Sequence, residues 1–226
     1  ERGKYLEAVG NYEIADRPLE AALVYRELGE HAKAARMFER ADKYEDAAGE
    51  YAEAGEPDLA AAALEKAGEY SRAAEIYGEV GNPSKQGQML ERAEQYLEAG
   101  KAYLEAGAVE NAIRALQRIT ESDENFGEAQ ILLGDIFREK AIYKIAIQYY
   151  KRGLHEQKLG RSNLEPHYHL ANCLEGVGSL REALNLYESI VVVDYHFADA
   201  ADRIRLLEPQ VASTPATPSE LSPVSN

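Results

Sequence analysis

Residues 44–82 read YEDAAGEYAEAGE, PDLAAAALEKAGE and YSRAAEIYGEVGN, three segments of 13 residues that align without a gap. We number the positions of each segment as slots one to thirteen. Slots four and five hold Ala-Ala in all three segments, slot eight holds a large apolar residue, and slot twelve holds Gly55, Gly68 or Gly81. An internal repeat of this kind indicates a repeat fold more strongly than any other sequence signal.

The spacing of the apolar slots predicts that each segment is one short helix. Slots one, four, five, eight and eleven fall on one helix face, and glycine in slot twelve suits the left-handed turn that ends a helix. A helix of about ten residues is marginal alone in water, so its apolar face must pack on neighbouring helices. We therefore expect an all-α stack of helices.

The 13-residue repeat continues on both sides of this stretch, as far as residue 119. The segments begin at Tyr5, Pro18, His31, Tyr44, Pro57, Tyr70, Pro83, Tyr96 and Val109. Alternate segments carry tyrosine in slot eight and glycine in slot twelve, which makes the structural unit a pair of helices with a period of 26 residues. Gly3 would occupy slot twelve of an earlier segment, and we expect the repeat to continue upstream of residue 1.

The composition narrows the functional classes. The chain has 226 residues, a formal net charge of -15 and one cysteine, Cys173. One cysteine allows no intramolecular disulfide and is compatible with a reducing compartment, so we expect a cytoplasmic protein. No apolar run is long enough for membrane insertion, and the acidic charge disfavours nucleic acid as a partner.

Two longer segments follow the short repeats. Residues 127–154 resemble a tetratricopeptide repeat, a helix–turn–helix unit of about 34 residues. The matching residues are Leu133, Gly134, Phe137, Tyr143, Ala146 and Tyr150. A second copy, residues 164–190, matches through Leu170, Ala171, Leu174, Gly178, Leu180, Ala183 and Tyr187. Ala141 stands where the turn glycine of the family is usual, and the 26-residue pairs are similar to the helix pairs of SNAP-like trafficking adaptors.

This resemblance implies a right-handed superhelical α-solenoid of antiparallel helix pairs. Residues 1–119 would form its short-repeat part, and residues 127–207 would continue the same solenoid as two tetratricopeptide units with a capping helix at 197–207. Residues 208–226 are rich in Pro, Ser and Thr, and we expect them to be a disordered tail or linker. The resemblance also implies a protein–protein interaction scaffold or adaptor that binds a protein or peptide.

In the tetratricopeptide family the first helix of each pair lines a concave groove. The resemblance therefore implies partner-binding roles for Glu128, Ile131, Asp135, Arg138, Tyr168, Asn172 and Glu175. Members that clamp a C-terminal carboxylate carry Lys and Arg in such positions. Only Arg138 is cationic among these residues, so we do not expect binding of that type.

An acidic band between residues 45 and 79 is the strongest charge feature of the chain. Ten acidic residues stand there against two basic ones, Lys66 and Arg72. The residues that we single out are Glu45, Asp46, Glu50, Glu53 and Asp58. Such a band can serve only to keep the surface soluble, or it can steer a basic partner segment toward the chain.

The sequence offers no pattern typical of a catalytic, cofactor or metal site. It has no phosphate-binding glycine loop, nucleophile elbow or zinc-helix motif, and we expect no enzyme activity and no cofactor. His169 and Cys173 could share a helix face, but no second ligand pair stands at a recognisable spacing. Two other functions remain open: a structural or self-assembling spacer arm, and a regulatory segment of a larger multidomain enzyme.

Overall fold

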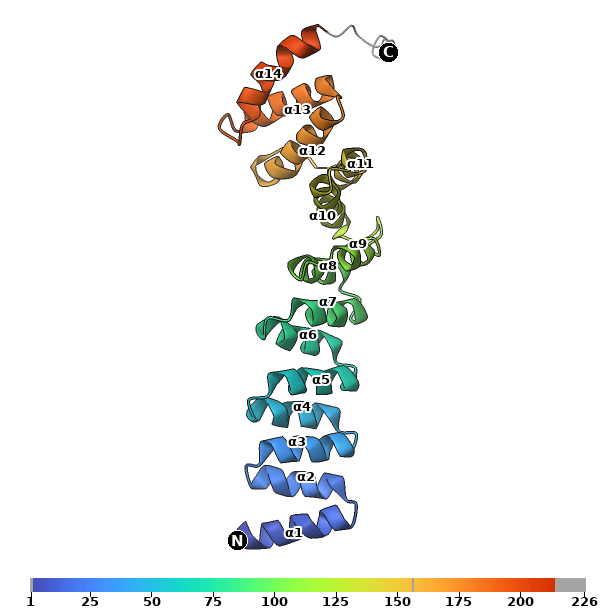
Figure 1. The fold of residues 1–226 in the computed structure, drawn as a ribbon, viewed down its shortest axis with the longest axis vertical. Helices are drawn as coiled ribbons and strands as arrows, with labels where there is room; N and C mark the ends of the chain where they lie inside the picture. The colour runs from blue at the N-terminus through green and yellow to red at the C-terminus, as the bar shows by residue number, and fades with distance from the viewer. Residues whose placement is uncertain (1, 156, 214–226) are drawn as a thin grey trace. The chain divides into compact units, whose positions relative to one another are not determined.

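The computed structural model describes residues 2–155 and 157–213, which form fourteen α-helices and one short 3-10 helix (Figure 1). No β-strand occurs among these residues. The all-α fold of paired helices expected from the repeat is therefore confirmed. The chain divides into two compact units, Glu1–Arg118 and Ile119–Asn226.

The first unit contains the nine helices drawn from blue to green in Figure 1. They are α1 (Arg2–Ile14), α2 (Pro18–Glu27), α3 (His31–Arg40), α4 (Tyr44–Glu53), α5 (Pro57–Ala67), α6 (Tyr70–Glu79), α7 (Pro83–Arg92), α8 (Tyr96–Glu105) and α9 (Val109–Leu116). Each helix packs against the next one along the chain. From α2 onward, every helix of this unit begins at the residue predicted to occupy slot one.

Slot twelve has a left-handed backbone whether or not it holds glycine. Gly29, Gly55, Gly68, Gly81 and Gly107 have φ angles between 69 and 83°. The same slot holds Asp16, Asp42 and Glu94 in other segments, with φ angles of 49, 55 and 60°. The turn geometry is therefore fixed by the packing of successive helices, and a side chain in this slot bears the steric cost of that geometry.

Ala141 occupies the corresponding turn in the second unit and has a φ angle of 56°. We expect Ala141→Gly to stabilise the protein by about 0.5–1 kcal/mol. Glycine removes a steric clash of the Cβ atom that costs about 1–2 kcal/mol in the left-handed conformation. Part of this gain is offset because glycine loses more backbone entropy than alanine when the chain folds. Urea denaturation followed by circular dichroism measures the change. The reciprocal variant Gly107→Ala should lower stability, and equal stabilities for all three proteins would contradict this explanation of the turns.

The core of the first unit is made of the alanine pairs and the slot-eight tyrosines. Ala47, Ala60, Ala61 and Ala73 are fully buried, as the sequence predicts. Small side chains in slots four and five allow neighbouring helices to approach closely, and the large slot-eight residues fill the remaining space. Tyr51, Tyr77 and Tyr103 are only 3%, 1% and 1% exposed.

Helix α7 departs from the Ala-Ala pattern with Gln86 and Gly87, and the packing explains the glycine. A Cβ atom on Gly87 would lie 2.8 Å from Cδ1 of Tyr103. In α8 the same slot holds Gly100, where a Cβ atom would lie 2.6 Å from Cδ2 of Leu116. The large side chain on the following helix therefore occupies the space that a methyl group would need.

The second unit contains α10 (Phe126–Glu139), α11 (Tyr143–Gly153), the 3-10 helix η1 (Arg161–Asn163), α12 (Leu164–Gly176), α13 (Leu180–Val193) and α14 (Ala200–Ala212). Its core brings together Tyr150, Leu170, Cys173, Tyr187 and Leu207, each buried. Gly134 on α10 repeats the arrangement of Gly87, since a Cβ atom there would lie 2.8 Å from the ring of Tyr150.

The last helix differs in its bounds from the cap expected at residues 197–207. Helix α14 begins at Ala200 and continues through Pro209 to Ala212. The remainder of the expected tail, residues 214–226, lies outside the described residues. Among the residues that are described, no helix combines the length and the apolar character required to cross a membrane.

Candidate binding surfaces

Tyrosines of the first unit join neighbouring helices through a carboxylate twelve residues earlier in the chain. The Tyr51 hydroxyl donates to Oε2 of Glu39 at 2.8 Å, and Tyr25 and Tyr103 make the same bond to Glu13 and Glu91 at 2.9 Å. Burial of the ring and the bond to Glu39 raise the pKa of Tyr51 to about 12. These bonds use carboxylates that the sequence alone would place on a solvated surface.

A basic side chain from the next helix pair completes this arrangement. Nζ of Lys66 donates to Oε1 of Glu39 at 2.7 Å and lies 5.8 Å from the centre of the Tyr44 ring. Arg92 repeats the pattern one pair later, bonding Glu65 at 2.8 Å over the ring of Tyr70. Burial raises the pKa of Glu39, but the bonds from Lys66 and Tyr51 outweigh burial and lower it. Much of the basic charge of this unit is therefore engaged between helix pairs.

Four of the five residues chosen in the acidic band lie on the surface of α4 and α5. Glu45, Asp46, Glu53 and Asp58 are exposed. Glu45 forms a pair with Arg72 at 3.5 Å between two exposed side chains. Within the described residues no basic group lies at ion-pair distance from the other three carboxylates, so they remain available to solvent or a partner.

Glu50 is the exception, and its place in an exposed band has to be corrected. It is 7% exposed, Nδ1 of His31 donates to its Oε2 at 2.8 Å, and Nε of Arg26 lies 3.9 Å from its Oε1. The carboxylate packs between α2, α3 and α4 because it occupies slot seven. The repeat carries a signal for this burial, since slot seven of the other segments with tyrosine in slot eight and glycine in slot twelve holds Val24, Ile76 and Ala102.

A groove in the first unit adjoins this buried carboxylate. It has a volume of about 790 Å³. Its lining includes both charge signs and an exposed glycine: Arg26, Asp42, Lys43, Tyr44, Glu45, Asp46, Gly49, Glu50, Lys66, Ala67 and Arg72. These residues belong to α2, α4, α5, α6 and the turn before α4, and three of them belong to the acidic band.

The residues predicted to line a groove in the second unit do come together, on α10 and α12, but most of them bond to other helices. Oδ1 of Asp135 accepts from the Tyr150 hydroxyl at 2.5 Å and from Nδ1 of His169 at 2.9 Å. Nε of Arg138 donates to the same hydroxyl at 3.3 Å. Burial raises the pKa of Asp135, but its bonds with His169 and Tyr150 and the charge of Arg138 hold it below the usual range.

A second set of bonds engages the predicted residues of α12. The Tyr168 hydroxyl donates to Oδ1 of Asp199, and Nε of Arg203 donates to Oδ2 of that carboxylate at 2.9 Å. Arg203 also bonds Glu175 at 3.2 Å, and the Tyr187 hydroxyl contacts both Glu175 and Asn172. Together these bonds connect α12, α13 and α14.

Most of the residues predicted to bind a partner are therefore engaged in bonds or contacts within the second unit. Ile131 packs against the core, and Glu128 alone among the seven is exposed. The polar partners Tyr150, His169 and Asp199 were not predicted from the sequence. The tyrosines match the family's core pattern, which indicates burial of the ring but gives no sign of where the hydroxyl bonds.

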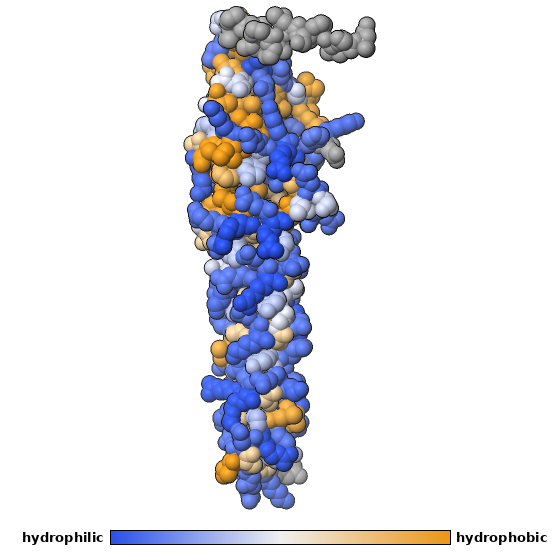
Figure 2. Space-filling model, turned by 90° about the vertical axis from the view of Figure 1, so that its right-hand side faces the viewer, coloured by the Kyte–Doolittle hydropathy of each residue, from blue (hydrophilic) through white to orange (hydrophobic). Residues whose placement is uncertain are grey.

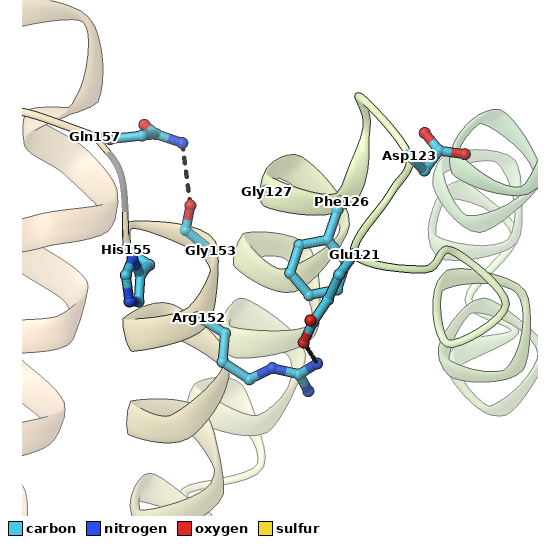
Figure 3. A pocket seen from close by; sticks show the side chains of 8 residues that line it. All are labelled: Glu121, Asp123, Phe126, Gly127, Arg152, Gly153, His155 and Gln157. Atoms are coloured by element: carbon cyan, nitrogen blue, oxygen red, sulfur yellow. Dashed lines mark hydrogen bonds and ion pairs between the residues drawn. The ribbon is translucent and has the colours of Figure 1, made fainter.

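A pocket that was not predicted from the sequence lies in the second unit, at the start of α10 and the end of α11 (Figure 3). It has a volume of about 630 Å³. The Arg152 side chain lies 5.2 Å from the centre of the Phe126 ring and pairs with Glu121 at 3.1 Å. Its helices meet closely because a Cβ atom on Gly153 would lie 2.8 Å from the carbonyl oxygen of Gly127.

The histidines and cysteine considered as metal ligands have other contacts. His167 is 8% exposed and its Nδ1 bonds the carbonyl oxygen of Asn163 at 2.8 Å, while His169 bonds Asp135. Cys173 is fully buried, and burial raises the pKa of its thiol to about 11. In the part of the chain that the structure describes, no group of three or more His, Cys, Asp and Glu side chains could hold a metal ion.

The two units differ in surface character on the face shown in Figure 2. Larger hydrophobic patches gather over the second unit, whereas the first unit is mainly hydrophilic with isolated apolar side chains. Exposed apolar residues of the second unit include Ile142, Ile145, Val192, Tyr195 and Leu206.

Comparison with a known family places one repeat in the middle of the chain. The family model for the tetratricopeptide repeat matches residues 96–125. The match covers α8, α9 and the loop that follows, and it lies upstream of both longer repeats expected from the sequence. No curated protein sequence matches the chain.

Solved structures share the fold at low sequence identity. The protein MamA (AMB-1) is 17% identical over 63% of this chain and 81% of its own, with a TM-score of 0.53. The C-terminal part of a tetratricopeptide-repeat protein from Cytophaga hutchinsonii is 15% identical over 90% of this chain and 95% of its own, with a TM-score of 0.51. The Naa15/Naa10 complex bound to HypK-THB matches at 15% identity over 91% of this chain and 35% of that chain, with a TM-score of 0.57.

Proposed function

Because this chain is a helical repeat protein of the tetratricopeptide type, we propose that it is a non-catalytic, cytoplasmic scaffold that binds a partner protein or peptide. Stacked helix pairs expose a long surface relative to their core, and proteins built in this way use that surface to bind other chains. The structure of Naa15/Naa10 bound to HypK-THB, which shares the fold, supports this use of the surface.

The observation that carries the proposal is the group of exposed carboxylates on α4 and α5. Asp46, Glu53 and Asp58 are exposed and lie outside the ion pairs that join the helix pairs of the first unit. Unpaired charges of one sign steer a partner of the opposite sign. The proposed partner therefore carries a basic segment that lies across α4 and α5.

The groove predicted from the family resemblance is the competing face. Asp135, Tyr168, Asn172 and Glu175 already bond to other helices of the second unit, and a partner there would have to exchange those bonds for its own. The acidic face requires no such exchange, and for this reason we place the partner on α4 and α5.

Charge reversal tests the choice of face. We expect the variant with Glu45, Asp46, Glu53 and Asp58 changed to Lys to keep its fold and to bind a partner captured from cell extract more slowly and more weakly. Each exposed pair is worth less than about 1 kcal/mol, so several must be reversed together. Added salt should reproduce the loss, because the screening length is about 8 Å at physiological ionic strength.

A matched control changes the same number of exposed carboxylates elsewhere in the unit. Glu75, Glu79, Glu98 and Glu105 are all exposed, and their reversal to Lys produces the same net charge. Association and dissociation rates measured by surface plasmon resonance at low and high salt distinguish the two variants. Salt-insensitive binding with equal affinity for both would show that the acidic band serves only to keep the surface soluble.

A further inference from the structure

We infer that the groove over Gly49 and Glu50 in the first unit binds an extended peptide segment, with a lysine or arginine of that segment directed at the Glu50 carboxylate. This inference rests on the proposed scaffold function and names the place and the chemistry of binding. The inference is based on two adjacent residues of α4 that depart from the repeat. One lacks a side chain at an exposed slot, and the other carries a charge at a buried slot.

The first departure is Gly49, which occupies slot six. This slot faces solvent in the other helices of the same kind, where it holds the long side chains of Leu23, Glu75 and Lys101. Gly49 is exposed, and a Cβ atom built on it would meet nothing within 4 Å. Glycine inside a helix is less favourable than alanine, and packing gives no reason for it here.

Three other glycines inside helices do have a packing reason, while Gly3 and Gly10, which like Gly49 meet nothing within 4 Å, lie outside the groove lining. A Cβ atom on Gly87, Gly100 or Gly134 would lie less than 3.0 Å from a large side chain. Gly49 instead lines the groove and leaves a gap there, which we call the notch, where the backbone of α4 is open to contact. A residue without a side chain at such a place permits close approach by another main chain.

The second departure is Glu50, a buried carboxylate in a slot that holds apolar or small residues in the other repeats. Burying a charge is costly unless it is paired and hydrogen-bonded. His31 supplies one bond at 2.8 Å, but Nε of Arg26 is 3.9 Å from the carboxylate, beyond hydrogen-bond distance. The carboxylate therefore has acceptor capacity left, and it lines the groove beside the notch.

Departures from a repeat pattern that reduce stability are expected at functional sites. Here Gly49 leaves space for another main chain in the groove, and the buried carboxylate of Glu50 is the next residue of the helix. The groove walls carry both donors and acceptors, from Arg26, Lys43 and Arg72 on one hand and Asp42, Glu45 and Asp46 on the other. That mixture suits the alternating N–H and C=O groups of an extended main chain, and Glu50 selects a cation.

The test uses a displayed library of short linear peptides of random sequence, selected on the whole chain. We expect selected peptides to share a Lys or Arg and to lose at least about tenfold in affinity for Glu50→Gln, as when one partner of a hydrogen-bonded charge pair is removed. Gly49→Leu, which restores the residue found at this slot in α2, should block the notch and abolish binding of the same peptides.

Matched controls separate binding from folding. Glu79→Gln neutralises an exposed carboxylate that lies outside the groove lining, and it should leave affinity unchanged. Gly10→Leu fills a second helix position that has nothing within 4 Å, and it should also bind normally. Gly49→Ala should raise the melting temperature, because the space is empty, and should still weaken binding.

The outcomes distinguish failure of this inference from failure of the proposed function. Selected peptides that bind Gly49→Leu and Glu50→Gln as well as the original chain would place their site elsewhere and overturn the inference, while the scaffold function would stand. If repeated selections yield no peptide that binds the original chain, the inference is also overturned. In that case, only the charge-reversal experiment with a captured protein still tests the scaffold function.

Discussion

Truncation of Tyr77 to alanine is expected to destabilise the protein by about 3–5 kcal/mol, the cost of removing a large aromatic side chain from a packed core. Tyr77 is 1% exposed and fills the space beside the fully buried Ala73. The lost contacts leave a cavity that short helices held by their neighbours cannot easily close. Tyr51→Ala should behave in the same way, since Tyr51 occupies the same slot one helix pair earlier.

Urea denaturation followed by far-ultraviolet circular dichroism measures this effect. Repeats contact mainly their neighbours, so amide hydrogen exchange should show the largest loss of protection in α5, α6 and α7. Glu53→Ala, which shortens an exposed side chain on α4, should change stability by less than about 0.5 kcal/mol. A Tyr77→Ala protein that unfolds at the same urea concentration as the original would show that the 13-residue register is wrong.

Replacement of Asp135 by alanine should cost about 3 kcal/mol, because it leaves the Tyr150 hydroxyl and His169 without their acceptor, at about 1–3 kcal/mol for each orphaned group. Tyr150 is fully buried, so water cannot readily replace the carboxylate. Asp202→Ala is the control: Asp202 pairs with Arg205 on the surface of α14, where both side chains are mostly exposed. Its loss should cost less than about 0.5 kcal/mol.

The Asp135 carboxylate should also make the stability of the folded chain depend on pH. The pKa of Asp135 is lower in the folded chain than in the unfolded one, despite its burial, because its bonds with His169 and Tyr150 favour the charged form. Its contribution to stability is therefore fully present above the unfolded pKa of about 3.9 and is lost as the pH falls through the lower folded value. The stability difference between the original chain and Asp135→Asn should shrink as the pH falls below about 4. A difference that stays constant over this range would contradict the role assigned to the Asp135 charge.

The repeat register was predictable because it depends on spacing within single segments. Helices α2 to α9 begin at the residues in slot one, and the alanine pairs and slot-eight tyrosines form the core. The family match at residues 96–125 falls on α8 and α9, a 26-residue helix pair whose two segments follow the same 13-residue pattern. Gln86 and Gly87 depart from the Ala-Ala pattern, and the reason for Gly87 lies in the ring of Tyr103 on the next helix.

The candidate site was predictable only in part. The exposed positions of Glu45, Asp46, Glu53 and Asp58 follow from slots that lie outside the apolar face of the helix. The sequence alone does not show which carboxylates are already engaged by a tyrosine or a cation on another helix. Glu39 and Glu175 resemble other surface glutamates until Tyr51 and Tyr187 are placed beside them.

The spacing of residues along the chain predicts a stack of paired helices, the first residue of helices α2 to α9, and the small and aromatic residues that pack inside. These features depend on the spacing of apolar residues and on local backbone preference, and both can be recognised within a short stretch of sequence. The packing of the helices was needed to show that Glu50 is buried against His31, that Asp135 bonds Tyr150 and His169, and that Gly49 lines a groove. Those contacts join side chains from different helices. The residues next to a charged side chain in the sequence do not indicate which partner will lie beside it in the folded chain.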